Sequence, residues 1–461
     1  MRRPGPVPGR RRSRGTTLRA MLSLPADSYA ERRARLLDAL PDGAALLLPT
    51  NQEHHRNGDV EFPFRPDSDF YYVTGFAEPG AWALLRKGDD KPRYSLFVLP
   101  KDREREIWTG IRAGVEGATS TFGADAGFST EHLAKELGGL LEGVDTLYYA
   151  YGRHSAAEPT VQDVLATLRR GRKVHKGPAS IVDPGALLDD MRMHKSDAEL
   201  AVMRTAATIT ADAHTAAMRD VRPGMREYQV QAQIEYIFRS RGAWGWAYPS
   251  IVAAGANGCI LHYRAGEALL GDGELMLVDA GAEVDGYAAD VTRTSPVNGR
   301  FSGPQRDLYS LTLAVQERAC DFTKPGATLQ GMHDAVVEEL TQGLIDLGLL
   351  SGTVEENVES QAFKRYYMHR TSHWLGMDVH DVGRYRLTDG PGPGDNRPLA
   401  PGMVFTIEPG LYVAPDDEVA PEAFRGIGIR IEDDVLVTED GHENLTDACP
   451  KSIEDIEALR G

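Results

Sequence analysis

Two aspartates, Asp279 and Asp290, flank a predicted β-hairpin turn in the stretch ELMLVDAGAEVDGYAADVTRT. A turn at Val284 and Asp285 places them directly opposite each other, whereas a turn at Asp285 and Gly286 makes the pair diagonal. Because side chains alternate between strand faces, both registers leave the two carboxylates on one face. Opposed Cβ atoms lie about 5 Å apart, so like charges there are costly unless a cation bridges them or one carboxylate is protonated. The alternative is a solvated hairpin, but the apolar run LMLV before Asp279 favours burial.

Two glutamates lie on apolar strands nearer the C-terminus. Glu408 ends the predicted strand MVFTIE, and Pro409 and Gly410 follow it, which places its carboxylate at the edge of a cleft. Glu432 lies in GIRIEDD, where it shares one strand face with Arg430. Taken singly, each glutamate is more typical of an ordinary surface residue than of a metal ligand. Arg430 could also neutralise Glu432 as a purely structural pair.

Histidines gather in YMHRTSHWLGMDVHDVG, which contains His369, His373 and His380, and a fourth, His262, lies in CILHY. Two histidines four residues apart resemble a zinc-binding helix, but Arg370 stands where such a helix has its glutamate, and the flanking residues favour a loop. Carboxylates and imidazoles without a thiolate suit Mn²⁺, Co²⁺ or Fe²⁺, and they also accept Zn²⁺. Two such ions about 3.5–4 Å apart can share a hydroxide, so the residues predict metal-assisted hydrolysis without naming the bond.

An internal repeat is predicted to position these residues, within one domain of about residues 190–455. Each half has a helix, a basic-Pro-Gly break (222–224 and 324–326), a second helix and then strands. The first helix begins at a capping box formed by Ser196 and Glu199. Two halves packed face to face leave a cleft lined by both sets of strands. The predicted strands are SIVAAG, CILHY, ELMLVDAG, YAADVTRTS, MVFTIEPGLYV and GIGIRIEDDVLVTE.

The preceding segment alternates between predicted strands and helices, so we expect a smaller α/β domain there. Its predicted strands are GAALLLP, DFYYVTGF, AWALLRK and RYSLFVLP, and its predicted helices are SYAERRARLLDAL, TEHLAKELGGLL and TVQDVLATLRRG. The expected division of the chain is a flexible basic tail over 1–27, an N-terminal domain over 28–190 and a catalytic domain over 191–461.

The composition excludes several classes of protein. The 461 residues are 41% hydrophobic and 26% charged, which is typical of a soluble globular protein. The net charge of −17 repels phosphate backbones and argues against a nucleic-acid partner. No run approaches the roughly 18 apolar residues of a membrane span. Three cysteines form no disulfide framework, so the cytoplasm is the expected compartment. The arginine-rich first twenty residues are best interpreted as a flexible tail, or as the result of a start codon assigned too early. A nucleic-acid-binding arm is the less favoured interpretation.

Several long motifs, in order along the chain, resemble aminopeptidase P, the Xaa-Pro aminopeptidase family of pita-bread metallopeptidases. They are YPSIVAAGANGCILHY, VDAGAEVDGYAADVTRTSPVNGRF, SHWLGMDVHDVG, EPGLYV, GIGIRIEDD and, near the N-terminus, RPDSDFYYVTGFAEPGA. The resemblance covers nearly all of residues 28–460. It implies an α+β fold, in which a C-terminal pita-bread domain with a pseudo-two-fold repeat follows a smaller α/β domain. It also implies two divalent ions, usually Mn²⁺, with the ligands Asp279, Asp290, His373, Glu408 and Glu432.

The implied reaction is release of the N-terminal residue from a peptide whose second residue is proline. Asp290 and Glu432 would bridge the two ions. Glu408 would move a proton between the attacking hydroxide and the leaving proline nitrogen. His380 or His369 would donate a hydrogen bond to the developing oxyanion.

Other residues of the resemblance would hold the substrate or the ligands. Proline has no N–H for strand-like binding, so an apolar pocket near His262 and Tyr263 would replace it. His262 is also one of the family's supporting histidines. Arg430 and Tyr412 would orient the metal ligands. Trp108 matches a tryptophan that family tetramers present to a neighbouring subunit's cleft, which implies a homo-oligomer.

The sequence departs from the family at Arg370, where a small residue is common, and this changes the expected shape of the local pocket. Two rival functions remain. A prolidase would use the same metal set on Xaa-Pro dipeptides. A pita-bread domain without metals would bind other proteins, although all five ligand types are present here.

Overall fold

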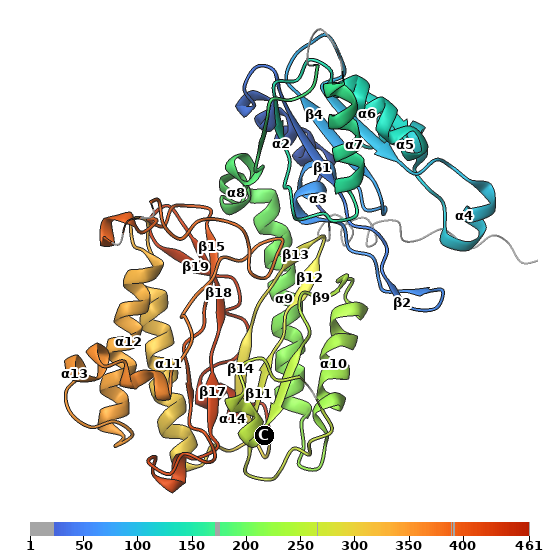
Figure 1. Cartoon of the computed structure of the whole chain (residues 1–461). Helices are drawn as coiled ribbons and strands as arrows, with labels where there is room; N and C mark the ends of the chain where they lie inside the picture. Colours follow the sequence, from blue (N-terminus) through green and yellow to red (C-terminus); the bar gives the residue numbers. More distant parts are fainter. Residues whose placement is uncertain (1–22, 171–175, 265, 389, 391, 461) are drawn as a thin grey trace, which may run out of the picture. The chain divides into compact units, whose positions relative to one another are not determined.

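The fold was analysed in a computed structural model, which describes residues 23–170, 176–264, 266–388, 390 and 392–460 (Figure 1). The chain divides into two compact units, one over Pro25–Met191 and the other from Arg192 to the C-terminal end. Most of the predicted tail, residues 1–22, lies outside the described residues. No helix among those described is both long and apolar enough to cross a membrane.

The N-terminal unit is built on a six-stranded mixed sheet. Its strands are β1 (Ala44–Pro49), β4 (Trp82–Arg86), β5 (Tyr94–Val98), β6 (Ala126–Ser129), β7 (Thr146–Tyr148) and β8 (Ser180–Val182). They lie in the order β6-β5-β4-β1-β7-β8, with β1 antiparallel to β4 and parallel to β7. Every residue of β1, β4 and β5 is buried, as their continuous apolar runs predict. A separate hairpin contains β2 (His55–Asn57) and β3 (Val60–Glu61).

Helices follow or precede most of these strands. They are α2 (Ala26–Ala39), α3 (Ser68–Thr74), α4 (Arg103–Thr109), α5 (Gly114–Ser120), α6 (Leu133–Leu141), α7 (Glu158–Arg169) and α8 (Gly185–Met193), with a 3₁₀ turn, η1 (Thr130–His132). Leucines and valines of α6 and α7 pack on the sheet in one buried cluster with β1, β4 and β7.

The segment DFYYVTGF, predicted as a strand, is instead helix α3. The Asp67 carboxylate accepts a hydrogen bond from the N–H of Phe70 (3.0 Å), which caps the start of the helix. Gly75 ends it in the left-handed region, with φ of 64°. Every residue of α3 is buried. A short apolar run fits a buried helix as well as a buried strand, so here the capping residues decide the conformation.

The C-terminal unit repeats one arrangement of helices and strands. Its two helix pairs are α9 (Asp197–Asp220) with α10 (Glu227–Ser240), and α11 (Gly303–Phe322) with α12 (Leu329–Asp346). Gly224 and Gly326, between the helices of each pair, both have φ of 87°. Their N–H groups donate to the carbonyl oxygens of Leu270 and Leu399, each at 2.9 Å. The two halves therefore match in backbone conformation as well as in order, and the predicted α+β fold with an internal repeat is confirmed.

Strands from both halves lie between the two helix pairs (Figure 1). The first half contains β9 (Gly245–Trp246), β10 (Ile251–Ala254), β11 (Leu275–Asp279), β12 (Ala282–Val284), β13 (Tyr287–Ala288) and β14 (Thr292–Pro296). The second contains β15 (Val404–Ile407), β16 (Gly410–Tyr412), β17 (Gly428–Arg430), β18 (Asp433–Val437) and β19 (His442–Asn444). Each half contains a three-stranded antiparallel sheet, in the order β10-β11-β14 in the first half and β15-β18-β19 in the second.

Short helices and turns complete this unit. They are α13 (Val354–Glu359), α14 (Ile453–Ala458), η2 (Gly255–Cys259), η3 (Ala362–Arg365), η4 (Pro393–Asp395) and η5 (Glu422–Phe424). The segment CILHY, predicted as a strand, is not one. The Ile260 N–H donates to the Asn257 carbonyl (3.0 Å), and the Tyr263 N–H donates to the Ile260 carbonyl (3.2 Å). These turns place His262 on a loop.

Candidate metal centre

The hairpin that carries the two aspartates turns at Asp285 and Gly286. Both have positive φ, 49° and 79°, which fits the tight two-residue turn that joins β12 to β13. In this register Asp279 lies opposite Thr292, and Asp290 is diagonal to it. This is the second of the two registers that the sequence left open. The hydroxyl of Tyr248 donates to Asp279 Oδ1 (2.6 Å) and also contacts Asp290 Oδ1, so both carboxylates face the same side.

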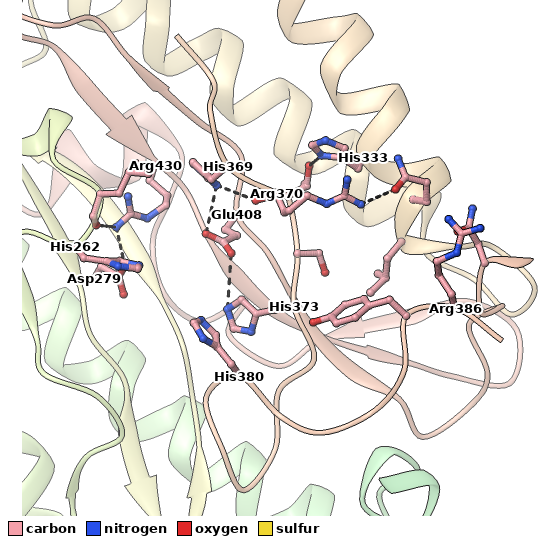
Figure 2. Close-up of a pocket in the computed structure, with 17 residues that line it drawn as sticks. His262, Asp279, His333, His369, Arg370, His373, His380, Arg386, Glu408 and Arg430 are labelled. Atoms are coloured by element: carbon pink, nitrogen blue, oxygen red, sulfur yellow. Dashed lines mark hydrogen bonds and ion pairs between the residues drawn. The ribbon is translucent and has the colours of Figure 1, made fainter. Parts of the chain in front are cut away.

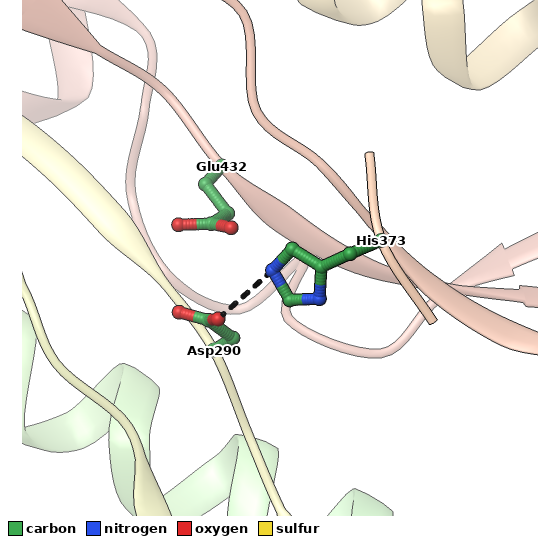
Figure 3. Close-up of side chains that lie close together, drawn as sticks. All are labelled: Asp290, His373 and Glu432. Atoms are coloured by element: carbon green, nitrogen blue, oxygen red, sulfur yellow. Dashed lines mark ion pairs between the residues drawn. The ribbon is translucent and has the colours of Figure 1, made fainter. Parts of the chain in front are cut away.

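Three of the predicted ligands meet in one small space, although they come from three separate segments (Figure 3). Asp290 lies between β13 and β14, His373 on the loop before β15, and Glu432 between β17 and β18. One ligand atom from each lies within 4.8 Å of the other two. The His373 Nε2 is 3.5 Å from Asp290 Oδ2. Such a group of oxygen and nitrogen donors fits a divalent cation.

The other two predicted ligands border the same space (Figure 2). Glu408 directly follows β15, and its Oε1 is 3.7 Å from His373 Nε2. Its Oε2 is 3.8 Å from His369 Nδ1. Asp279 ends β11 and accepts a hydrogen bond from Arg430 Nη2 (2.7 Å). The structure thus brings all five predicted ligands together at the junction of the two halves.

Burial and mutual repulsion govern the charges of this group. Burial, followed by the neighbouring carboxylates, raises the pKa of Glu432 well above its usual value, and burial raises the pKa of Asp290. Burial raises the pKa of Glu408 to about 7. Burial disfavours the charged form of His373, but Asp290 and Glu408 raise its pKa to about 9. Carboxylates crowded in a buried space are hard to ionise together unless a cation offsets their charge. The donor set therefore fits the implied metal.

Hydrogen bonds from neighbouring side chains fix the ligand orientations. Thr292 Oγ1 donates to Glu432 Oε2 (2.6 Å), and Arg430 Nε donates to Thr292 Oγ1 (3.1 Å). Arg430 Nη1 donates to the hydroxyl of Tyr412 (2.9 Å), which also lies 2.9 Å from His369 Nε2. Arg430 is buried, as are Thr292 and Tyr412. The positions expected to orient the ligands, Arg430 and Tyr412, therefore contact them directly or through one side chain.

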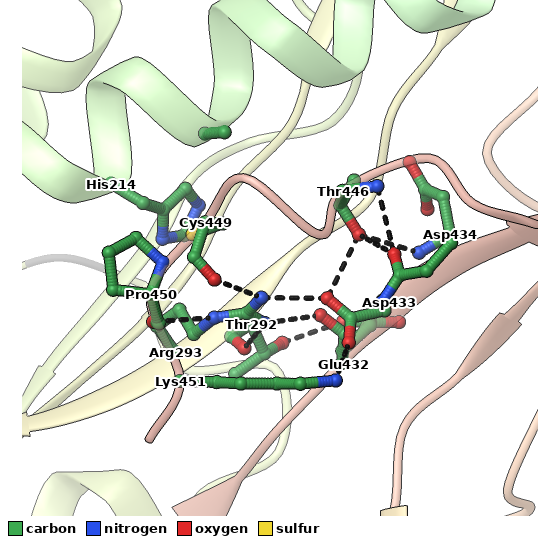
Figure 4. A network of polar contacts seen from close by, with 12 residues as sticks. His214, Thr292, Arg293, Glu432, Asp433, Asp434, Thr446, Cys449, Pro450 and Lys451 are labelled. Carbon is green, nitrogen blue, oxygen red and sulfur yellow. Dashed lines mark hydrogen bonds and ion pairs between the residues drawn. The ribbon is translucent and has the colours of Figure 1, made fainter. Parts of the chain in front are cut away.

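A buried network of ion pairs and hydrogen bonds contacts the backbone of two predicted ligands, Glu432 and Asp290 (Figure 4). Arg293 donates to the backbone carbonyl of Glu432 (2.6 Å) and to Asp433 Oδ1 (2.7 Å). Lys451 Nζ donates to Asp433 Oδ2 (2.7 Å). The next residue, Asp434, accepts the N–H of Asp290 at 3.1 Å. The network therefore holds the backbone on both sides of the candidate metal centre.

Two cavities meet at the metal centre. The smaller, of about 260 Å³, is lined by Tyr248, Ile251, Tyr263 and Val379 among others. The larger, of about 580 Å³, extends past His369 to the start of α12. Both are bordered by the same five residues, His262, Asp279, His373, His380 and Glu408.

The remaining predicted site residues lie as follows. His380 packs edge-on against His373, with ring centroids 4.3 Å apart, and His262 borders both cavities. Trp108 belongs to the N-terminal unit, where it lies on α4 and is 87% exposed.

Sequence reasoning missed Tyr248, Thr292 and Asp434, each of which contacts a predicted ligand. The second register already implied that Thr292 faces Asp279. Nothing in the spacing of Tyr248 pointed to the hairpin.

Comparison with known proteins shows the family of this chain. Residues 201–439 match the family model described as metallopeptidase family M24, and residues 29–148 match the aminopeptidase P N-terminal domain. The Xaa-Pro aminopeptidase of Escherichia coli (strain K12) is 43% identical over 95% of this chain and 98% of its own. The structure of Pseudomonas aeruginosa aminopeptidase PepP superposes with a TM-score of 0.92 at 46% identity, covering 95% of this chain and 98% of that one. Zinc-substituted E. coli aminopeptidase P in complex with product superposes with a TM-score of 0.91 at 43% identity and the same coverage. This chain belongs to metallopeptidase family M24 and, within it, to the pita-bread aminopeptidase P proteins.

Proposed function

We propose that this protein is a metal-dependent aminopeptidase that releases the N-terminal residue from peptides with proline in the second position. One observation carries the proposal: a group of three potential metal ligands and two further carboxylates, Asp279 and Glu408, lie where a small cavity meets a large one. A cavity of about 260 Å³ is suited to a single residue, and one of about 580 Å³ to the rest of a peptide. An enzyme that removes one residue at a time needs this unequal division. The relatives named Xaa-Pro aminopeptidase support the choice of proline.

The metal is proposed to be a pair of divalent ions, most simply Mn²⁺ as the sequence predicts. Asp290 and Glu432 would bridge the pair, as the family resemblance implies, and both belong to the group of three potential ligands that lie within 4.8 Å of one another. His373 and Glu408 would complete one side and Asp279 the other. Such ions, when bound, polarise a scissile carbonyl and lower the pKa of water towards 7.

The protein's own residues would orient the peptide and move the proton. Glu408 borders both cavities, so its carboxylate reaches the atoms on either side of the scissile bond. We assign it the transfer of the proton from water to the leaving proline nitrogen. His369 supports Glu408 and is itself held by Tyr412. His262 borders both cavities, so it would contact the first residue and the proline ring, whereas Tyr263 lines the smaller cavity and would contact the first residue.

A peptide panel separates this function from its rivals. With Mn²⁺ present, we expect release of alanine from Ala-Pro-Ala-Ala, and none from Ala-Ala-Ala-Ala or the dipeptide Ala-Pro, as measured by mass spectrometry. Cleavage of the dipeptide alone would instead identify a prolidase. The third reading, a binding module, predicts no bound divalent ion after purification and no turnover with added Mn²⁺. Removal of the metal with a chelator should abolish activity, and Mn²⁺ should restore it.

His380 tests the division between ligands and substrate-binding groups. We expect His380→Ala to lower kcat by about 10²-fold, because one hydrogen-bond donor to the oxyanion is lost. The metal content after dialysis should be unchanged, because His380 packs against the ring of His373 without joining the group of potential ligand atoms. Elemental analysis alongside kcat measures both effects, with His442→Ala on β19 as the control. Loss of metal from His380→Ala would make that residue a ligand.

We also propose a homo-oligomer and a cytoplasmic location. Ile107, Trp108 and Ile111 are 77%, 87% and 90% exposed at and beside α4, and apolar side chains so exposed favour contact with another subunit. Cys320 and Cys449 are buried and unpaired, as in a protein of a reducing compartment.

A further inference from the structure

The larger cavity has two chemically different ends (Figure 2). Its carboxylate lining, Asp279 and Glu408, lies at the metal centre. Its far end is formed by the first residues of α12, Leu329 and Gln330, and by Arg370 with other uncharged or basic side chains. No carboxylate among the described residues lines that far end. A peptide that leaves the metal centre along this cavity therefore passes from an acidic to a basic environment.

Arg370 supplies a positive charge at that far end. It is exposed, and its Nη2 donates to Gln330 Oε1 at 2.7 Å, which holds the guanidinium against the cavity wall. Gln330 also donates to Asp334 (2.6 Å), which lies outside the lining. Within the described part of the chain, no carboxylate lies within ion-pair distance of Arg370. Its charge is therefore available to a ligand.

Two neighbours decide how positive this end is. Burial, together with the charge of Arg370, lowers the pKa of His333 to about 4, so His333 is neutral near pH 7. Arg386 lies 3.6 Å from Asp395, which offsets much of its charge. The N-terminus of α12 adds the positive end of its helix dipole beside Arg370, since Leu329 and Gln330 begin that helix. Arg370 and this helix end are thus the main sources of positive potential there.

We propose that Arg370 is a specificity-determining residue, which selects peptides that carry a carboxylate shortly after the proline. The inference rests on the proposed function, because it assigns the larger cavity to the residues that follow the scissile bond. The carboxylate can belong to an aspartate or glutamate side chain at the third or fourth position. It can equally be the free C-terminus of a short peptide. The chain as a whole carries a charge of −17, which disfavours acidic peptides, so a local positive group is needed to bind them.

The test compares four peptides that differ in charge at the third residue or at the C-terminus. They are Ala-Pro-Gln-Gly-amide, Ala-Pro-Glu-Gly-amide and Ala-Pro-Lys-Gly-amide, and Ala-Pro-Gln-Gly with a free C-terminus. For the wild-type protein, we expect kcat/KM for the glutamate peptide to exceed that for the lysine peptide by about fivefold, chiefly through KM, as befits a solvent-exposed pair. If the free C-terminus is the carboxylate that Arg370 binds, kcat/KM for Ala-Pro-Gln-Gly should exceed that for its amide by a similar factor. Added salt should reduce either preference.

Variants of Arg370 assign the preference to that side chain. Arg370→Gln should bring the glutamate-to-lysine ratio close to one, Arg370→Lys should keep most of it, and Arg370→Glu should invert it. Because the ratio is taken within one enzyme preparation, losses of folding or metal loading cancel. Lys364→Gln is the matched control, since Lys364 is exposed, donates to Gln361 (2.8 Å) and does not line the cavity. It removes the same charge and should leave the ratio unchanged.

The outcomes separate this inference from the function it rests on. Equal ratios in the wild-type protein and Arg370→Gln, with the neutral peptide cleaved normally by the wild-type protein, would overturn the role of Arg370 and leave the aminopeptidase standing. A wild-type protein that cleaves none of the four peptides with Mn²⁺ present would overturn both. If Lys364→Gln lowers the glutamate-to-lysine ratio as much as Arg370→Gln does, the preference is a general effect of charge, and the proposed role of Arg370 is wrong.

Discussion

Asp290→Asn and Glu432→Gln are each expected to abolish turnover and metal retention together. Both carboxylates lie in the group whose ligand atoms are within 4.8 Å of one another, and the family resemblance assigns both as ligands shared by the two ions. The outer partners of metal ligands are alone worth roughly 10–100-fold, so loss of a bridging ligand should cost about 10³-fold or more in kcat/KM. Calorimetric titration with Mn²⁺ and steady-state kinetics measure the two effects.

The Tm of the metal-free protein distinguishes loss of a metal ligand from a general structural defect, because a structural defect would lower that Tm. Asp290 and Glu432 are buried beside further carboxylates, and burial together with repulsion from these carboxylates raises the pKa of Glu432. Neutralising Glu432 should therefore leave the metal-free Tm equal to or above that of the wild type, whereas Asp290→Asn also removes the ion pair of Asp290 with His373. The increase in Tm on adding Mn²⁺ should disappear, because it depends on binding to the folded state. Glu443→Gln, which breaks an exposed pair with Arg204, is the control. Normal metal affinity in Asp290→Asn would refute the bridging role.

The long helices were predictable from the sequence because their signals are local. The capping box of Ser196 and Glu199 begins α9, with the Ser196 N–H donating to Glu199 Oε2 at 2.9 Å. The repeat was recognisable because Gly224 and Gly326 occupy one left-handed position in each half. Only glycine takes this conformation without strain, so the RPG and KPG breaks recur with it.

Signals that depend on distant partners were not predictable in the same way. The hairpin pattern allowed two registers, and the positive φ of Asp285 and Gly286 selects one. Tyr248 is remote in sequence from Asp279, yet it contacts both aspartates, because β10 and β11 pair with Ile251 opposite Asp279. The basic end of the larger cavity was not predictable for the same reason. It forms only when the start of α12 lies beside Arg370, which is distant in sequence.

Asp433→Asn is expected to produce the largest loss of stability, although Asp433 contacts neither cavity. Its two carboxylate oxygens accept hydrogen bonds from Arg293 and Lys451, both at 2.7 Å, and the Arg293 and Asp433 side chains are fully buried. Replacing the carboxylate with an amide leaves two cations without their counter-charge. Breaking a buried ion pair from one side typically costs about 3–5 kcal/mol in the free energy of unfolding. Denaturant unfolding of the metal-free protein measures this, with Glu443→Gln, which has an exposed partner in Arg204, expected to cost no more than about 1 kcal/mol.

The pH dependence of that loss identifies the carboxylate charge as its cause. Burial alone would raise the pKa of Asp433, but Arg293 and Lys451 hold it well below the usual value. A lowered pKa in the folded state contributes stability that is complete above the unfolded pKa, about 3.9, and lost as the pH falls below it. The difference in the free energy of unfolding between the wild-type protein and Asp433→Asn should therefore be constant from about pH 7 to 5 and become smaller below about pH 4. Because Arg293 also donates to the carbonyl of Glu432, the variant should bind Mn²⁺ more weakly even where it remains folded. A difference in unfolding free energy that does not narrow in acid would show that packing, and not charge, makes Asp433 necessary.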